Sequence, residues 1–388
     1  MTTVRRFSVE ARRARLVARL AAKADAVEDV VRRLVAVHAT DPATVYLAVA
    51  ARLADPGGAV PAVERALYAR PAGLTRMLAM RRTMFVVTRE FAPEVYAAAG
   101  RRIAVKERKG LLGYLADGGG WDAAWLAEVE AEVTATLAAH PESSGAQLSR
   151  LVPRLREQVV VARGKPYEAT QNIASRIIRT MAAEGLIERR RPAGSWTSGQ
   201  FRWAIAEPLP EMPAEPARAA LAGAWLGAYG PGTEADLKWW AGWTLGETRK
   251  ALAAVGAEQV LLDDGATGHV LPGDTGGEAS KERPAVRLLP ALDPVAMGWQ
   301  ERGWFLPEAR AGLFDRTGNI GPTVWWGGEV VGGWAQRPDG AVVWRRLADR
   351  GSGVDAAVDE TAAGLTVLLG DVRVTPRFRT PLERELCA

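Results

Sequence analysis

The chain has 388 residues, of which 48% are hydrophobic and 24% are charged; this composition is typical of a globular protein with several domains. Its net charge of +5 indicates an anionic partner such as nucleic acid. One cysteine, Cys387, and three scattered histidines argue against disulfides, and we expect no metal and no cofactor. Because there is no signal segment and no bilayer-length apolar run, we expect a cytoplasmic protein with no membrane partner.

The first part of the chain, residues 1–117, is predicted to contain helices around a short polar connector. Apolar residues at helical spacing from Val27 onward predict an amphipathic helix. Asp41, followed by a proline, is typical of the N-cap of the next helix. Between the two helices, His38 and Thr40 lie two residues apart, so an extended backbone would point both side chains the same way.

Two β-forming runs follow within residues 74–87 and meet at Arg81 and Arg82, with Thr83 beginning the second run. Helices followed by a hairpin predict a winged helix. An arginine at this hinge can contact a DNA phosphate, and the alternative interpretation is a solvated hinge without a ligand. Both interpretations remain open.

Residues 121–207 are predicted to form a second winged helix. A helix expected from Thr170 ends at Gly185, a residue typical of helix C-termini. It leads into a hairpin whose predicted turn carries three arginines, Arg189, Arg190 and Arg191. Such a basic turn favours binding to phosphates.

A proline-rich linker leads to a third predicted winged helix, residues 215–283, in which Thr244 and Glu247 are spaced as a capping box. Residues 284–388 are rich in β-forming runs, and we expect a small β-barrel-like domain there. Three tryptophans in the third unit could stack on bases, but their spacing favours a place in the core: Trp239, Trp240 and Trp243.

The chain resembles the winged-helix DNA glycosylases of the AlkZ/YcaQ type in three segments, Val35–Leu53, Leu74–Val87 and Leu289–Trp334. The segment YGPGTEADLKWWAGW, which begins at Tyr229, is also similar. These enzymes excise bulky or crosslinking N-alkylated purines. The resemblance implies an α+β fold with three tandem winged-helix domains in a C-shaped array and a small C-terminal domain. It also implies a monomer that binds double-stranded DNA containing alkylated purines, in the cytoplasm at the nucleoid.

The sequence departs from that family at its motifs. His38-Ala39-Thr40 occupies the place of a catalytic QxQ or QxD motif, and Arg82 replaces the glycine of an RGT hinge. The position implies that His38 orients a water as a base, that Thr40 holds the same water, and that Asp41 supplies an anionic field. Each has a structural alternative: a packed histidine, a capping threonine and an N-cap aspartate.

Hydrolysis of an N-glycosidic bond develops positive charge on the sugar, and an N7-alkylated purine is already a cationic leaving group. The resemblance therefore implies a monofunctional DNA glycosylase for N7- or N3-alkylated purines. Bulky adducts and interstrand crosslinks are the expected lesions, in DNA repair or in self-resistance to a genotoxic natural product. The missing glutamines leave one alternative, a catalytically inactive winged-helix DNA-binding protein that regulates transcription or sequesters lesions.

Overall fold

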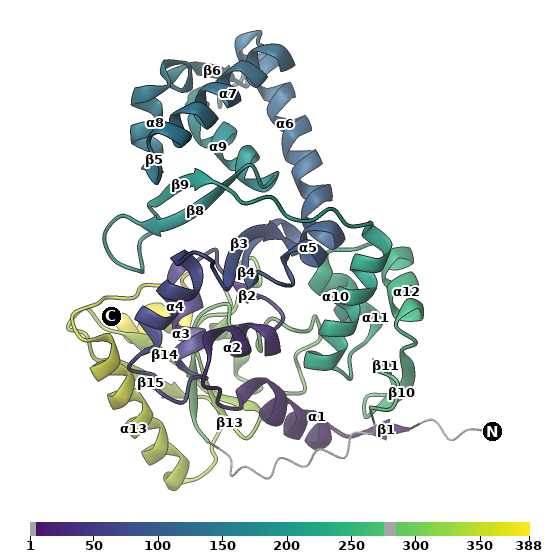
Figure 1. The fold of residues 1–388 in the computed structure, drawn as a ribbon. Helices are drawn as coiled ribbons and strands as arrows, with labels where there is room; N and C mark the ends of the chain where they lie inside the picture. Colours follow the sequence, from purple (N-terminus) through teal and green to yellow (C-terminus); the bar gives the residue numbers. More distant parts are fainter. Residues whose placement is uncertain (1–4, 275–284) are drawn as a thin grey trace.

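The computed structural model describes residues 5–274 and 285–388 and has an α+β fold (Figure 1). The domain boundary predicted between residues 283 and 284 lies outside the described residues. The described part of the chain contains no helix that is both long and apolar enough to cross a membrane.

The first unit packs helices against a three-stranded antiparallel sheet of order β2-β4-β3. Its elements are β1 (Arg6–Phe7), α1 (Val9–Leu16), the π-helical turn η1 (Val17–Ala21), α2 (Val27–Arg33), β2 (Val37–His38), α3 (Pro42–Ala50), α4 (Ala59–Tyr68), β3 (Leu74–Ala79), the 3-10 turn η2 (Met80–Arg82) and β4 (Thr83–Thr88). The predicted pair of strands that meet at Arg81 and Arg82 is confirmed by β3, η2 and β4.

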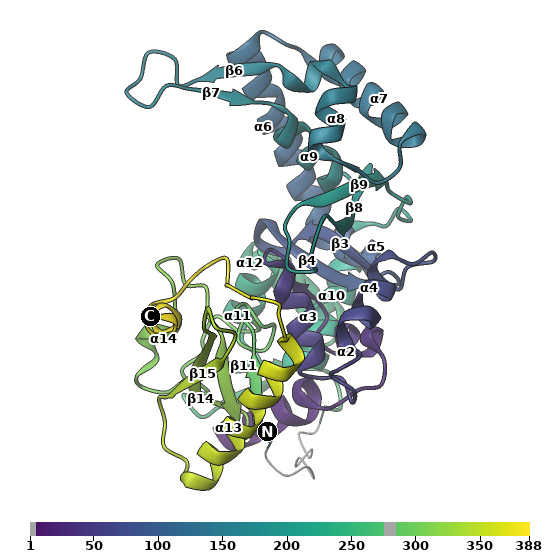
Figure 2. The same cartoon turned by 90° about the vertical axis from the view of Figure 1, so that its left-hand side faces the viewer.

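The second unit is carried on a long helix and has its own small sheet of order β5-β9-β8. Its elements are α5 (Ala92–Val95), η3 (Tyr96–Gly100), α6 (Arg101–Gly119), α7 (Ala123–Ala139), β5 (Ser143–Ser144), α8 (Gly145–Leu151), η4 (Pro153–Arg156), β6 (Gln158–Val161), β7 (Ala169–Asn172), α9 (Ala174–Ala183), β8 (Ile187–Pro192) and β9 (Phe201–Ile205). Figure 2 shows the hairpin β6–β7 projecting from this unit.

The start of helix α9 differs from the prediction. Thr170 lies in strand β7, which pairs antiparallel with β6, and the helix begins only at Ala174. The side chain of Asn172 accepts a hydrogen bond from the Ala174 backbone N–H at 2.8 Å, which fixes the new start. The predicted end is confirmed, because Gly185 adopts a left-handed φ of 75° just beyond the helix.

The third unit and the C-terminal part complete the chain. Their elements are α10 (Ala214–Tyr229), α11 (Glu234–Ala241), α12 (Leu245–Ala254), β10 (Glu258–Leu262), β11 (Thr267–Val270), β12 (Arg287–Leu289), η5 (Arg310–Leu313), β13 (Thr323–Trp326), β14 (Glu329–Gln336), β15 (Val342–Arg346), α13 (Ser352–Leu369) and α14 (Pro381–Cys387). The capping box predicted at Thr244 and Glu247 is confirmed at the start of α12.

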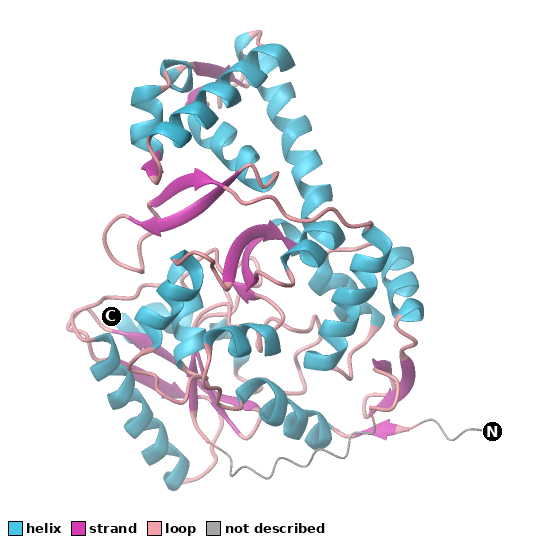
Figure 3. Ribbon diagram, viewed as in Figure 1, coloured by secondary structure: helices cyan, strands magenta, loops and turns pink. Residues whose placement is uncertain are grey.

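The C-terminal strands form an antiparallel sheet of order β12-β13-β14-β15 (Figure 3). The sequence predicts a barrel-like closure here, but β12 and β15 lie at opposite edges of the described sheet. Four strands are too few to curl into a closed barrel, and α13 packs near the edge strands β12 and β15. The described region is therefore an open sheet with a helix.

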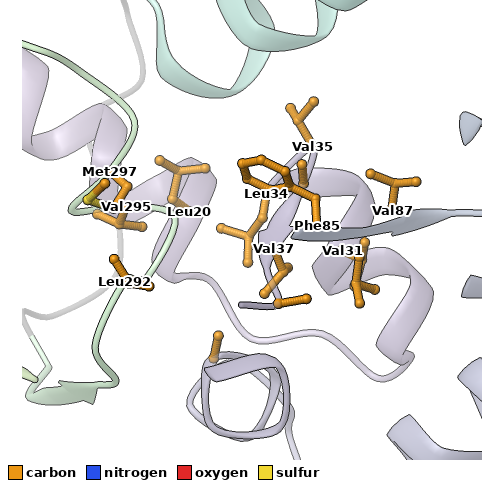
Figure 4. Close-up of a cluster of buried hydrophobic side chains, with 14 of the residues drawn as sticks. Leu20, Val31, Leu34, Val35, Val37, Phe85, Val87, Leu292, Val295 and Met297 are labelled. Atoms are coloured by element: carbon orange, nitrogen blue, oxygen red, sulfur yellow. The ribbon is translucent and has the colours of Figure 1, made fainter. Parts of the chain in front are cut away.

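The described residues contain four clusters of buried hydrophobic side chains. Two smaller ones join α3 to the C-terminal sheet and Phe7 to the hairpin β10–β11, and the other two are the main cores. The larger main core joins residues of the first unit, the third unit and the C-terminal part. Figure 4 shows Phe85 beside Leu34 in it, with Leu292, Val295 and Met297 on another segment. The smaller main core holds Leu126 and Ile177 and lies wholly within the second unit. The division into four domains, and the identification of three units as winged helices, remain predictions.

Candidate active site

His38 is the second residue of strand β2, between helices α2 and α3. It pairs with Phe85 of β4, and the two rings lie 4.4 Å apart between centroids. The next backbone N–H, that of Ala39, donates to the Met84 carbonyl oxygen at 2.8 Å. This strand pairing buries the imidazole, which is only 2% exposed. His38, the candidate base, is therefore packed into the hydrophobic core next to the hinge between β3 and β4.

The polar contacts of His38 fix its protonation. Its Nε2 atom lies 3.4 Å from a guanidinium nitrogen of Arg81. Because arginine only donates, Nε2 accepts in that contact, and the proton of the neutral ring lies on Nδ1. Burial, followed by the charge of Arg81, lowers the pKa of His38 well below its usual value of 6.5. The imidazole is therefore neutral at physiological pH.

Two polar atoms of the stretch are buried and have no hydrogen-bond partner among the described residues: His38 Nδ1 and Thr40 Oγ. A buried donor or acceptor left unpaired costs about 1–3 kcal/mol. In proteins such atoms are usually satisfied by an ordered water or a ligand. The stretch thus offers one donor and one hydroxyl that the protein itself does not use.

Asp41 has both carboxylate oxygens occupied. One accepts from the Ala43 backbone N–H at 3.1 Å as the N-cap of α3, and the other accepts from the Arg377 backbone N–H at 3.0 Å. Burial raises the pKa of Asp41, and the two backbone hydrogen bonds oppose that rise. The predicted capping role is confirmed, and the carboxylate also ties α3 to the C-terminal segment.

The hinge arginines point in different directions. Arg81, with a left-handed φ of 54°, lies 4.0 Å from the Trp239 ring centroid. Burial, followed by the neighbouring charge of Arg302, lowers the pKa of Arg81 to about 10. Arg82 is exposed and forms an ion pair with Glu107, and the Thr83 hydroxyl donates to the Arg81 carbonyl oxygen at 3.4 Å. Arg81 thus covers His38 on the side of the third unit.

The three arginines expected at a hairpin turn lie in strand β8 itself. Arg190 is buried, forms ion pairs with Glu142 at 3.1 Å and Glu188 at 3.4 Å, and donates to the Tyr68 carbonyl oxygen. Exposed Arg191 pairs with Glu64 of the first unit at 3.3 Å. These two side chains hold the second unit against the first.

Unlike Arg190 and Arg191, Arg189 forms no ion pair among the described residues, and its guanidinium packs on the rings of Phe201 and Trp203. Three further arginines act on its charge, Arg76 of β3, Arg179 of α9 and Arg377. Sequence reasoning missed these three because they come from distant segments without a local motif. Within the described residues, no three His, Cys, Asp or Glu side chains are grouped to hold a metal ion.

Comparisons with known proteins identify a family and a shared fold. The family described as DNA glycosylase AlkZ-like matches residues 31–369. The solved structure of the Streptomyces sahachiroi DNA glycosylase AlkZ is similar, with a TM-score of 0.68 and 21% sequence identity over 96% of this chain and 99% of that chain. A search of curated protein sequences gives no match. At this identity the structural likeness establishes a shared fold.

Proposed function

The chain belongs to the AlkZ-like DNA glycosylase family, and from this premise we propose that it excises N7- or N3-alkylated purines from duplex DNA as a monomer. We propose bulky adducts and interstrand crosslinks as its lesions, in DNA repair or in self-resistance to a genotoxic natural product. The observation that carries the proposal is the pair of unpartnered buried atoms, His38 Nδ1 and Thr40 Oγ, at the position of the family's motif.

A water held by this pair fits the chemistry of the reaction. Its oxygen accepts from His38 Nδ1–H and it donates one hydrogen to Thr40 Oγ, which leaves a lone pair for C1′ of the sugar. When the bond from C1′ to the purine nitrogen breaks, its electron pair neutralises the cationic alkylpurine. The water then forms the new bond to C1′ and releases a proton to solvent. His38 in this scheme orients the water and does not accept its proton.

Arg81 has a positioning role in the proposal. By donating to Nε2 it keeps the proton of the neutral ring on Nδ1, so the ring presents a donor to the water. Its stacking on Trp239 restricts the guanidinium. Both of the first two units contain a helix, a short strand, two helices and a hairpin in that order, with η4 and the hairpin β6–β7 inserted between the two helices of the second unit. This order supports winged helices as the cradle for the duplex.

The test is single-turnover excision from a duplex that contains one 7-methylguanine, scored as alkali-labile abasic sites. We expect release by the wild-type protein, and a rate lower by about a hundredfold in His38→Ala. Thr40→Val keeps the volume of the side chain and removes the hydroxyl, so we expect a loss of rate without loss of duplex binding. If the wild-type protein yields no abasic sites from any duplex in a series of N7- and N3-alkylpurine adducts, the glycosylase proposal is wrong.

Two observations favour the second candidate, a catalytically inactive DNA-binding protein: His38 is almost fully buried, and both carboxylate oxygens of Asp41 already accept hydrogen bonds. This candidate predicts salt-dependent duplex binding that His38→Ala leaves unchanged. The double variant His38→Gln/Thr40→Gln separates the two. Base release by the double variant and not by the wild-type protein would assign the natural chain to the inactive class.

A further inference from the structure

Four arginine side chains from four segments gather where the second unit meets the first. The guanidinium groups of Arg76 and Arg189 lie 5.0 and 5.1 Å from the same ring, that of Phe201. Arg179 and Arg377 lie close enough to act on the charge of Arg189. Like charges repel at such separations, so the protein holds together a cluster that opposes its own folding.

The nearby carboxylates do not balance this cluster. Glu107 is paired with Arg82, and Glu188 with Arg190. Among the described residues, Arg76, Arg179 and Arg189 have no ion pair. Arg76 donates to the Tyr68 hydroxyl, yet its Nε is buried without a partner. Arg179 is exposed and donates to the Ser175 carbonyl oxygen at 3.1 Å. Within the described residues, the cluster therefore has a hydrogen-bond donor without an acceptor and positive charge without a paired carboxylate.

These side chains face an open space. Arg76, Arg179 and Arg189 line a cavity of about 310 Å³ between hairpin β3–β4 and helix α9, many times the ~30 Å³ share of one water molecule. Met84, whose carbonyl oxygen holds the backbone next to His38, lines the same cavity. Arg377, through its backbone, holds the carboxylate of Asp41. The cavity therefore lies beside strand β4, which pairs with β2.

We propose that Arg76, Arg179 and Arg189 form a binding site for a backbone phosphate of duplex DNA. The inference rests on the proposed function and deepens it, because a phosphate held there would anchor the duplex where the hairpin β3–β4 meets the second unit. Guanidinium groups recognise phosphate oxygens by paired hydrogen bonds. A bound phosphodiester would also bridge the two units and relieve the repulsion within the cluster.

The experiment measures the affinity of the full chain for an undamaged duplex by fluorescence anisotropy over a salt series. For Arg179→Gln we expect about tenfold weaker binding, and a slope of log K against log salt that is smaller by about 0.9. Arg76→Gln should behave alike. The control is Arg345→Gln, which removes an exposed arginine that is ion-paired to Glu385 on the C-terminal sheet, and it should bind as the wild-type protein does.

Arg179→Glu separates a ligand site from a structural one. The new carboxylate would sit among the arginines in place of the phosphate, so the melting temperature should stay or rise while duplex affinity falls further. Inorganic phosphate should displace the duplex more strongly than chloride at equal ionic strength, because only phosphate offers oxygens for paired hydrogen bonds. Wild-type affinity and slope in Arg179→Gln would overturn the site, as would equal displacement by the two anions. Base excision is scored separately, so its absence would refute the glycosylase and leave this binding result standing.

Discussion

His38 is buried in the core as a neutral imidazole, and this burial makes the free energy of unfolding depend on pH. An unfolded histidine titrates near pH 6.5, whereas burial and Arg81 lower the pKa of the folded group. Below about pH 6.5 the unfolded chain therefore binds one more proton, and the free energy of unfolding falls by up to about 1.4 kcal/mol per pH unit. We expect urea denaturation to show this loss between neutral pH and about pH 5, and His38→Gln to reduce it.

His269 gives the matched control. Its pKa is also lowered by burial, but Glu234 and a backbone hydrogen bond oppose the shift. His269→Gln should therefore remove a smaller part of the pH dependence. An equal dependence in wild-type protein and His38→Gln would mean that the imidazole is accessible to protons in the folded state.

At the scale of single residues, the sequence predicts those contacts that form between residues close together in the chain. Asp41 followed by proline is a local cap signal, and the hydrogen bond to Ala43 confirms it. The contact between His38 and Arg81 could not be predicted, because the two residues are 43 positions apart and meet only when β2 pairs with β4. The gathering of Arg76, Arg179 and Arg189 has the same cause.

The hinge between β3 and β4 has two successive residues in the left-handed region, and the second is Arg82 with a φ of 59°. A residue with a Cβ atom pays about 1–2 kcal/mol in that conformation. Arg82→Gly and Arg82→Ala both remove the ion pair with Glu107, so their difference isolates the backbone. We expect the glycine variant to be more stable by about 1 kcal/mol in urea denaturation.

At an exposed helical position, used as the control, the alanine variant should instead be more stable than the glycine variant. Arg65 lies on the surface of α4, where alanine is favoured over glycine by about 1 kcal/mol. Arg65→Ala should therefore be more stable than Arg65→Gly. If alanine were also the better residue at position 82, the hinge would not have the left-handed backbone that places Arg81 over His38.

At the scale of elements, periodicity predicts the body of a helix better than its start. Ile173, Ile177 and Met181 recur at helical spacing in the sequence at α9, and all three are buried. The strand β7 before it has four exposed residues and no alternation, so nothing in its own sequence marks it. It exists because β6 offers a partner for its backbone.

At the scale of the whole molecule, the largest hydrophobic core crosses the domain boundaries that the sequence suggests. The Tyr229 hydroxyl donates to the Leu34 carbonyl oxygen, and buried Arg52 forms a bidentate pair with buried Asp293 at 2.8 and 2.9 Å. Such long-range contacts merge the first unit, the third unit and the C-terminal part. Composition and linkers cannot reveal this merging, because it depends on which apolar faces meet in space.

The smaller main core lies wholly within the second unit, whereas the larger one and the cluster of the C-terminal sheet share helix α3, and this separation predicts two cooperative unfolding units. Leu126 is buried in the smaller core and Leu34 in the larger one, so replacing either by alanine should cost its own unit about 2–5 kcal/mol. In calorimetry, Leu126→Ala should lower one thermal transition and Leu34→Ala the other. A duplex that bridges the two units should raise the transition of the smaller unit, and less so in Arg179→Gln. A single transition that both alanine variants lower equally would show that the polar contacts of Arg190 and Arg191 couple the units fully.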